Sequence, residues 1–216
     1  MNSPPTNNYA VMVSRARALF LTHDQAAMCA RLGLAMTEDA IPLRFLGAVY
    51  TVRRSDGAVL APGGEPADFN AAMTIYDALT HNKERAPTAA RRVPSRDGAP
   101  ALSGEWVPTS ALHGIRGSHA VHEDLHAPAA QRFAGKCPAL AAALEALGGR
   151  PGPGGDVSYI LDVFDFFPVC VRFYDADEEF PASLQFLWDA NALDFLYYET
   201  LWYVMDEVID ALTALI

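Results

Sequence analysis

Two neighbouring segments of alternating apolar residues restrict the possible folds of this chain most. Within residues 156–175, DVSYILDVFDFFPVCVRFYD, the odd-numbered positions are apolar in both segments: Val157, Tyr159, Leu161 and Val163, then Val169, Val171 and Phe173. A period of two predicts strands that each bury one face. A hairpin that pairs odd with odd positions puts both sets on one core face, and it places Asp162 and Arg172 near each other on the opposite face.

Other segments have the period of a helix or of a strand. Helical spacing predicts helices over residues 9–32, 67–82, 118–134 and 138–147, and a last helix from about Asp194. Apolar and polar residues alternate over residues 41–60, and Gly47 and the pair Asp56-Gly57 interrupt them with turn signals. This pattern predicts two or three antiparallel strands. Residues 183–188 predict one more strand.

The last predicted helix is apolar over most of its surface. Its polar residues Glu199, Asp206, Asp210 and Thr213 fall within a narrow stripe, and large apolar residues fill the rest. Such a helix is buried on more than one side. We therefore predict a single α+β domain over residues 1–216, with a mostly antiparallel sheet flanked by helices and a long buried C-terminal helix.

Residues 83–103, KERAPTAARRVPSRDGAPALS, differ in composition from the segments around them. They include three prolines, five basic residues and hardly any large apolar side chain. Such a segment cannot bury enough apolar surface to offset the entropy of ordering it. We predict a flexible surface loop inserted in the domain.

Charge is distributed unevenly along the chain, whose net charge is -10. Residues 1–150 carry 15 Lys and Arg against 13 Asp and Glu, whereas residues 151–216 carry 13 Asp and Glu against the single basic residue Arg172. A surface that acidic repels phosphate backbones, so nucleic-acid binding is not expected. It suits a cation, a metal ion or a basic protein partner, although acidic surfaces also serve solubility alone.

Hydropathy and cysteine usage predict the cellular location of the protein and the state of its cysteines. No apolar run reaches the roughly 20 residues of a membrane span, and the N-terminus has no basic leader before its apolar residues, so we expect a cytoplasmic protein without a membrane anchor. Cys29, Cys137 and Cys170 are odd in number and far apart, which predicts neither a disulfide framework nor a thiolate metal site.

The acidic loop after the second alternating segment is the first candidate site. Asp175 and Asp177 form a DxD pair followed by Glu178 and Glu179. Two carboxylates at this spacing can hold a divalent metal between them, or divide into an acid and a base. The alternative is a solvated turn whose charges protect a sheet edge.

A run of histidines is the second candidate site. His119, His122 and His126 stand at i, i+3 and i+7, which on a helix stacks three imidazoles on one face, with Glu123 close by. Three imidazoles with an open position suit zinc or a similar transition metal. The alternative is a set of partly exposed histidines without metal. No GxSxG, Walker A or GxGxxG pattern occurs, so the common hydrolase, NTPase and dinucleotide classes lack support.

The order of residues 41–52, 73–79, 103–112 and 144–201 resembles a bacterial and archaeal family known as domain of unknown function 3786. In that family a set of positions recurs, which here are Gly148, Gly149, Asp156, Pro168, residues 177–181, Asp189 and Glu199. The resemblance favours the acidic loop over the histidines. Some relatives carry an added iron–sulfur domain similar to that of corrinoid methyl-transfer proteins, which implies anaerobic one-carbon metabolism, but this chain lacks the cysteines for it.

These features lead to one main functional hypothesis and two alternatives. The main hypothesis is a non-catalytic accessory module that binds a small ligand, a cation or a basic partner through six acids: Asp175, Asp177, Glu178, Glu179, Asp189 and Glu199. The first alternative is a metal-dependent enzyme that uses the histidines, the acidic loop or both. The second is a purely structural subunit with an exposed apolar patch.

Overall fold

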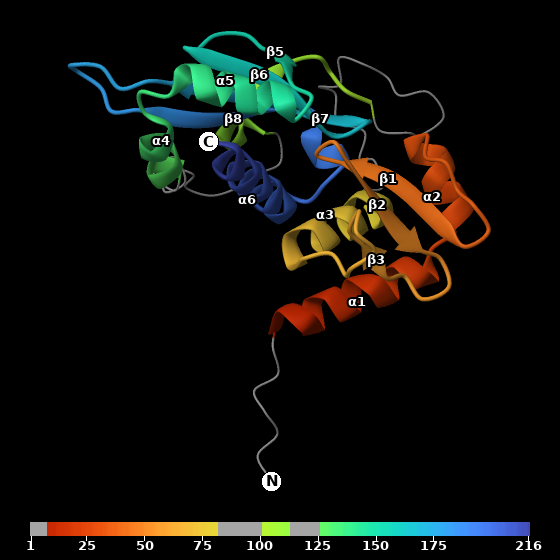
Figure 1. Cartoon of the computed structure of the whole chain (residues 1–216). Coiled ribbons are helices and arrows are strands. Elements are labelled where there is room, and N and C mark those ends of the chain that lie inside the picture. Colours follow the sequence, from red (N-terminus) through yellow and green to blue (C-terminus); the bar gives the residue numbers. More distant parts are fainter. Residues whose placement is uncertain (1–7, 82–100, 113–125) are drawn as a thin grey trace.

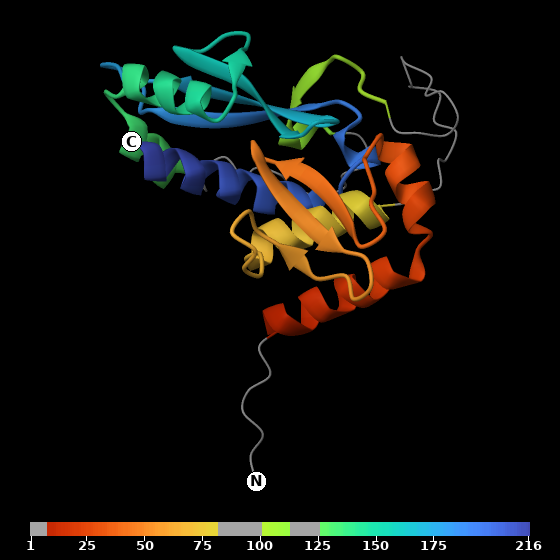
Figure 2. The same ribbon diagram turned by 45° about the vertical axis from the view of Figure 1, so that its right-hand side comes forward.

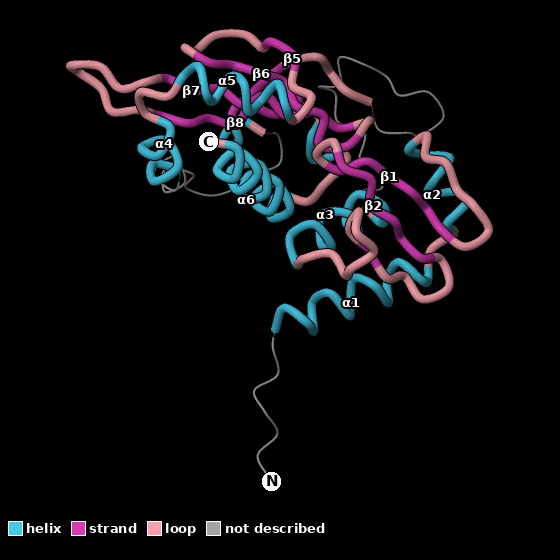
Figure 3. The backbone as a smooth tube through the Cα atoms, viewed as in Figure 1, coloured by secondary structure: helices cyan, strands magenta, loops and turns pink. Residues whose placement is uncertain are grey.

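The computed structural model describes residues 8–81, 101–112 and 126–216, and all its strand pairs are antiparallel. A three-stranded sheet of order β1-β2-β3 lies in the N-terminal part, and a five-stranded sheet of order β4-β8-β7-β6-β5 lies in the C-terminal part (Figures 1 and 3). Helices flank both sheets. The chain therefore has the α+β fold that its sequence predicts, with its strands divided between two sheets.

The N-terminal part contains three helices around its small sheet. Its elements in chain order are α1 (Asn8–Thr22), α2 (Gln25–Leu32), β1 (Ala40–Phe45), β2 (Ala48–Arg53), β3 (Val59–Leu60) and α3 (Phe69–Thr80). The single helix predicted over residues 9–32 is wrong, because Asp24 has an extended backbone and its carboxylate accepts hydrogen bonds from the N–H groups of Ala26 and Ala27. This side chain caps a second helix, so the chain turns between α1 and α2.

The five-stranded sheet contains the predicted hairpin. Its strands are β4 (Trp106–Pro108), β5 (Arg150–Pro151), β6 (Val157–Phe164), β7 (Phe167–Tyr174) and β8 (Ser183–Asp189). Val157 faces Phe173 and Leu161 faces Val169, so the predicted pairing of odd with odd positions is confirmed.

One contact predicted for this hairpin is wrong. Arg172 faces Ser158, and Asp162 faces Pro168, which is four positions further along the hairpin. At about 3.3 Å per residue, Arg172 and Asp162 therefore lie too far apart to pair. Asp162 pairs instead with Arg150 of the edge strand β5, at 2.8 Å, and the Arg172 guanidinium donates to the Pro153 carbonyl.

Helices α4 (Ala127–Phe133), α5 (Cys137–Ala146) and α6 (Tyr198–Leu215) belong to the C-terminal part. The long buried C-terminal helix is confirmed: α6 packs against α3 and α5, and it lies between the large sheet and the N-terminal part (Figures 1 and 2). It begins at Tyr198 because residues 192–194 form a short 3₁₀ turn of their own. No helix within the described ranges has the length and apolar content needed to cross a bilayer.

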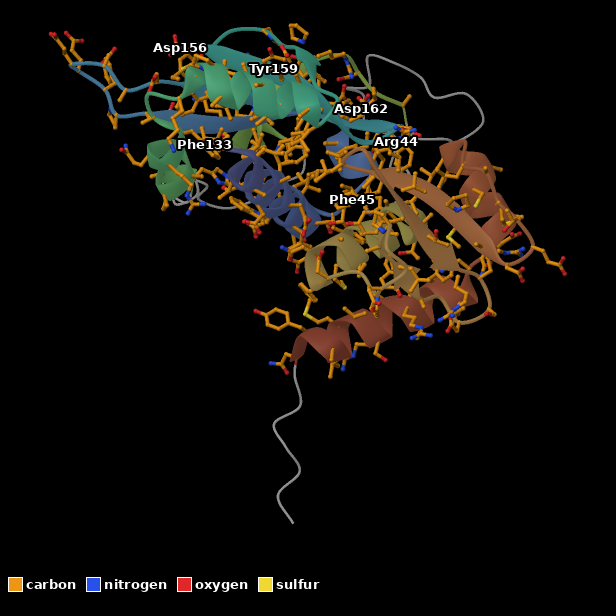
Figure 4. The ribbon with its side chains drawn as sticks, viewed as in Figure 1. Arg44, Phe45, Phe133, Asp156, Tyr159 and Asp162 are labelled. Atoms are coloured by element: carbon orange, nitrogen blue, oxygen red, sulfur yellow. The ribbon has the colours of Figure 1, made fainter. Side chains whose placement is uncertain are left out.

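Several contacts join the two sheets. The Leu46 N–H donates to the Val163 carbonyl at 3.0 Å, and the Phe45 and Phe164 rings lie 5.4 Å apart (Phe45 is labelled in Figure 4). Buried apolar residues from both parts belong to one continuous core. The connection between β7 and β8 extends outward from this core, as the blue loop at the left of Figure 1.

Candidate functional site

Residues 175–182 form the connection between β7 and β8, which extends past α4 and α5 in the tube view (Figure 3). Its end is a tight turn, because the Asp177 N–H donates to the Phe180 carbonyl at 3.0 Å. The Asp177 carboxylate accepts from the N–H groups of Glu179 at 2.8 Å and Phe180 at 2.7 Å. These two hydrogen bonds, that from Phe180 above all, hold the pKa of Asp177 below its ordinary value. Asp177 therefore shapes the turn.

Asp175 anchors the base of the same loop. Its carboxylate accepts from the N–H groups of Gly135 and Ala176, both at 2.8 Å, and the Cys137 thiol donates to its second oxygen. The Asp156 carboxylate, labelled in Figure 4, accepts from the Asp175 N–H at 2.8 Å. The hydrogen bond from Gly135 is the main reason why the pKa of Asp175 lies below its ordinary value. Asp175 thus ties the loop to the turn between α4 and α5.

The remaining residues of the turn point to solvent. Glu178 and Glu179 are exposed, and the Phe180 side chain is 66% exposed. None of the ion pairs found among the described residues involves either glutamate. We call Glu178, Glu179 and Phe180 the acidic tip. An exposed aromatic side chain that follows two exposed glutamates on a hydrogen-bonded turn is a surface suited to contact another molecule, since the backbone of the turn is already fixed.

The other two acids predicted for the site lie elsewhere. Asp189 ends β8, so the six residue steps from Ser183 place it about 20 Å from the acidic loop. It is 3% exposed and accepts hydrogen bonds from Ser103 N–H and Oγ–H and from the N–H groups of Gly104 and Asn191. Glu199 is exposed in the first turn of α6. The structure therefore does not bring the six acids together.

A comparison with models of protein families matches residues 24–211 to the family described as Domain of unknown function (DUF3786). The chain belongs to this family. The DUF3786 match begins at the residue that caps α2 and ends within α6, so it includes both sheets and the acidic tip. Searches of curated proteins and of solved structures found no match to the chain.

Of the three histidines in the run of this DUF3786 chain, the structure describes only His126. His119 and His122 lie outside the described residues. His126 precedes α4, and its ring stacks on Trp202 at 5.9 Å and lies 5.1 Å from Phe186. Within the described part of the chain, no three side chains of His, Cys, Asp or Glu are arranged to hold a metal ion.

The i, i+3 and i+7 spacing of the three histidines did not reveal a shorter motif within the same run. Residues 122–126 read HEDLH, which fits the pattern HExxH. On a helix this pattern aligns two imidazoles for zinc and places a glutamate as a general base. The signal was present in the sequence, because His122 and His126 stand at i and i+4 with Glu123 between them.

One buried pair in this DUF3786 chain was also missed. Asp77 and His81 end α3: the imidazole Nε2 donates to the Leu193 carbonyl at 3.1 Å, and Nδ1 lies 3.5 Å from the Asp77 carboxylate. The second oxygen of Asp77 accepts from the Tyr197 N–H at 2.7 Å. His81 is 1% exposed, so this pair fastens α3 to the start of α6 and does not meet solutes.

Proposed function

We propose that this chain is a non-catalytic partner-binding module, and that the acidic tip docks into an apolar recess on a basic protein surface. The exposed Phe180 ring carries the proposal, because a large aromatic side chain that is 66% exposed on a fixed turn has little role in folding. Aromatic anchors of this kind dominate the energetics of protein interfaces when a partner desolvates them.

The surroundings of Phe180 support a basic partner. Glu178 and Glu179 directly precede Phe180 in the chain, and residues 151–216 carry a net charge of -12. Complementary charge accelerates encounter and selects the partner, while the buried aromatic ring supplies affinity. The hydrogen bonds of Asp175 and Asp177 fix the loop before binding, so less conformational entropy is lost on docking.

Site-specific photo-crosslinking in the organism that encodes the protein tests this proposal. A photoreactive amino acid is placed at position 180, and a matched control carries it at position 49, where Val49 is 51% exposed on β2. We expect one defined crosslinked protein from position 180 that is absent from position 49. Identical crosslinks at both positions, or none at position 180, would contradict the proposal.

One observation favours a second function, a zinc-dependent enzyme: the HExxH pattern of residues 122–126. If the pattern holds zinc, protein purified without a histidine tag retains close to one equivalent of metal, and His122→Ala loses it. Elemental analysis that finds less than about a tenth of an equivalent of any transition metal would rule this function out, given the affinity of such sites.

A further inference from the structure

Residues 83–96, KERAPTAARRVPSR, are the most basic segment of the chain, and they lie outside the described residues. Five of the 16 Lys and Arg fall within them, against the single acid Glu84, so their net charge is +4. Arg91 and Arg92 are adjacent, and the apolar residues Val93 and Pro94 follow them. We call residues 83–96 the basic segment. It combines the two properties expected of a partner for the acidic tip, positive charge and an apolar surface.

The acidic tip presents groups that a pair of arginines can bind. The carboxylates of Glu178 and Glu179 are exposed, and no ion pair among the described residues involves them. A carboxylate accepts two parallel hydrogen bonds from one guanidinium group. A guanidinium group also binds to the face of an exposed aromatic ring such as that of Phe180.

Both ends of the segment that contains these arginines are attached to the fold near the end of β8. At one end, His81 Nε2 donates to the Leu193 carbonyl at 3.1 Å. At the other end, the Asn191 side-chain amide donates to the Ala101 carbonyl at 2.9 Å. Both partners follow β8 directly, whereas the β7–β8 connection precedes it (Figure 1). The attachments and the acidic tip therefore lie at opposite ends of this strand.

This separation disfavours contact between the tip and the basic segment of the same chain. Nine residue steps lead from Asp189 back to Phe180, which is about 30 Å of extended backbone. Arg91 is ten residues from each attachment, so its backbone reaches about 33 Å only at full extension. Contact within one chain would order nearly every residue on both sides, at a cost in conformational entropy for each. A second copy of the chain is free of this restriction.

We propose that the basic segment of one copy binds the acidic tip of a second copy, so that the protein associates with itself head to tail and shields the tip until a basic partner displaces the segment. This self-association rests on the proposed function, since it regulates the same tip. The segment's charge of +4 complements the -12 of residues 151–216. Because the two surfaces differ, each added copy leaves one tip and one segment open, and longer assemblies can form.

Sedimentation velocity of the full chain tests the proposal. Each copy has a net charge of -10, but at about 0.15 M salt the Debye length of about 8 Å screens this long-range repulsion and leaves close charge pairs attractive. The average mass should then rise above the 23.4 kDa of one chain as protein concentration increases. About 1 M salt should reverse the rise. A single-chain mass up to about 1 mM protein would overturn the proposal.

Two double variants with the same change in charge test the role of the arginines. Arg91→Gln with Arg92→Gln should weaken self-association by about tenfold, because it removes two guanidinium contacts. Arg15→Gln with Arg44→Gln removes two exposed positive charges elsewhere and should associate as wild type does. Equal weakening by both double variants would show that only net charge matters, and would contradict the specific contact.

Mixing two defective variants tests the head-to-tail arrangement. The arginine double variant keeps an intact tip, and the tip variant Glu178→Gln, Glu179→Gln, Phe180→Ala keeps an intact basic segment. Each alone should sediment mostly as single chains. Their mixture should form pairs that grow no further, because each pair has one working contact. A mixture that remains single chains would overturn the arrangement.

Failure of self-association and failure of the proposed function give different results. If the purified protein remains a single chain while position 180 crosslinks a different protein in the organism, self-association is wrong and the docking role of the tip stands. If position 180 crosslinks only a second copy, in the organism and in the purified protein, self-association stands and docking to another protein is wrong.

Discussion

Replacing Asp189 with alanine is expected to lower the free energy of unfolding by about 3 to 5 kcal/mol. The change removes the acceptor of four hydrogen bonds, from Ser103 N–H and Oγ–H, Gly104 N–H and Asn191 N–H, in a place that is almost closed to solvent. Partly buried donors that lose their acceptor cost much of their desolvation energy, and the buried position of Asp189 is left without its hydrogen bonds. Urea unfolding followed by circular dichroism measures the change.

Asp165→Ala is the matched control for this experiment. Asp165 is an aspartate in the turn between β6 and β7, and its ion pair with Arg44 is exposed and 3.4 Å long. Exposed pairs contribute little, so its loss should cost less than about 1 kcal/mol. Equal costs for Asp189→Ala and Asp165→Ala would show that Asp189 is not a structural acceptor, and would return it to the candidates for ligand binding.

Replacing Gly149 with alanine is expected to cost about 3 kcal/mol, whereas the same change at Gly148 should cost about 1 kcal/mol. A Cβ atom at position 149 would lie 2.6 Å from the Leu144 carbonyl oxygen and 3.0 Å from a methyl group of Leu161. The backbone of α5 would have to move away from β6. Gly148 has a φ of +81° but open space around it, so only its backbone conformation is strained.

Thermal unfolding of the two variants separates the cost of the steric clash at position 149 from the cost of the backbone conformation at position 148. Gly148→Ala should lower Tm by a few degrees and Gly149→Ala by several times more. A larger loss for Gly148→Ala would show that backbone conformation, and not the approach of α5 to β6, is the constraint at this turn. Both glycines belong to the set expected from the family resemblance, and the structure gives them different physical roles.

Most of the fold could be predicted from local periodicity. The odd-numbered apolar positions of β6 and β7 fix their register, because a slip by one residue would turn every apolar side chain to solvent. The break at Asp24 was missed since the apolar spacing continues across it, and only the capping contacts reveal two helices. Likewise, Asp162 found a partner on β5, a strand too short to be recognised from its residues.

The candidate site was less predictable, because adjacency in sequence does not say what a carboxylate contacts. Asp175 and Asp177 accept backbone hydrogen bonds within their own loop, which leaves Glu178, Glu179 and Phe180 to face outward. Asp189 meets residues about 85 positions earlier in the chain, and Asp77 accepts from the Tyr197 N–H across a still longer separation. Such pairs leave no local pattern that periodicity could detect.

Partner affinity tests the central claim most directly. The protein crosslinked from position 180 is purified, and its Kd for wild type is compared by calorimetry with that for the triple variant Glu178→Gln, Glu179→Gln, Phe180→Ala. We predict a loss of at least about a hundredfold, since hot-spot residues each contribute 2 kcal/mol or more. Wild-type affinity should also fall as salt rises. An affinity that changes less than about twofold would contradict a docking role for the acidic tip.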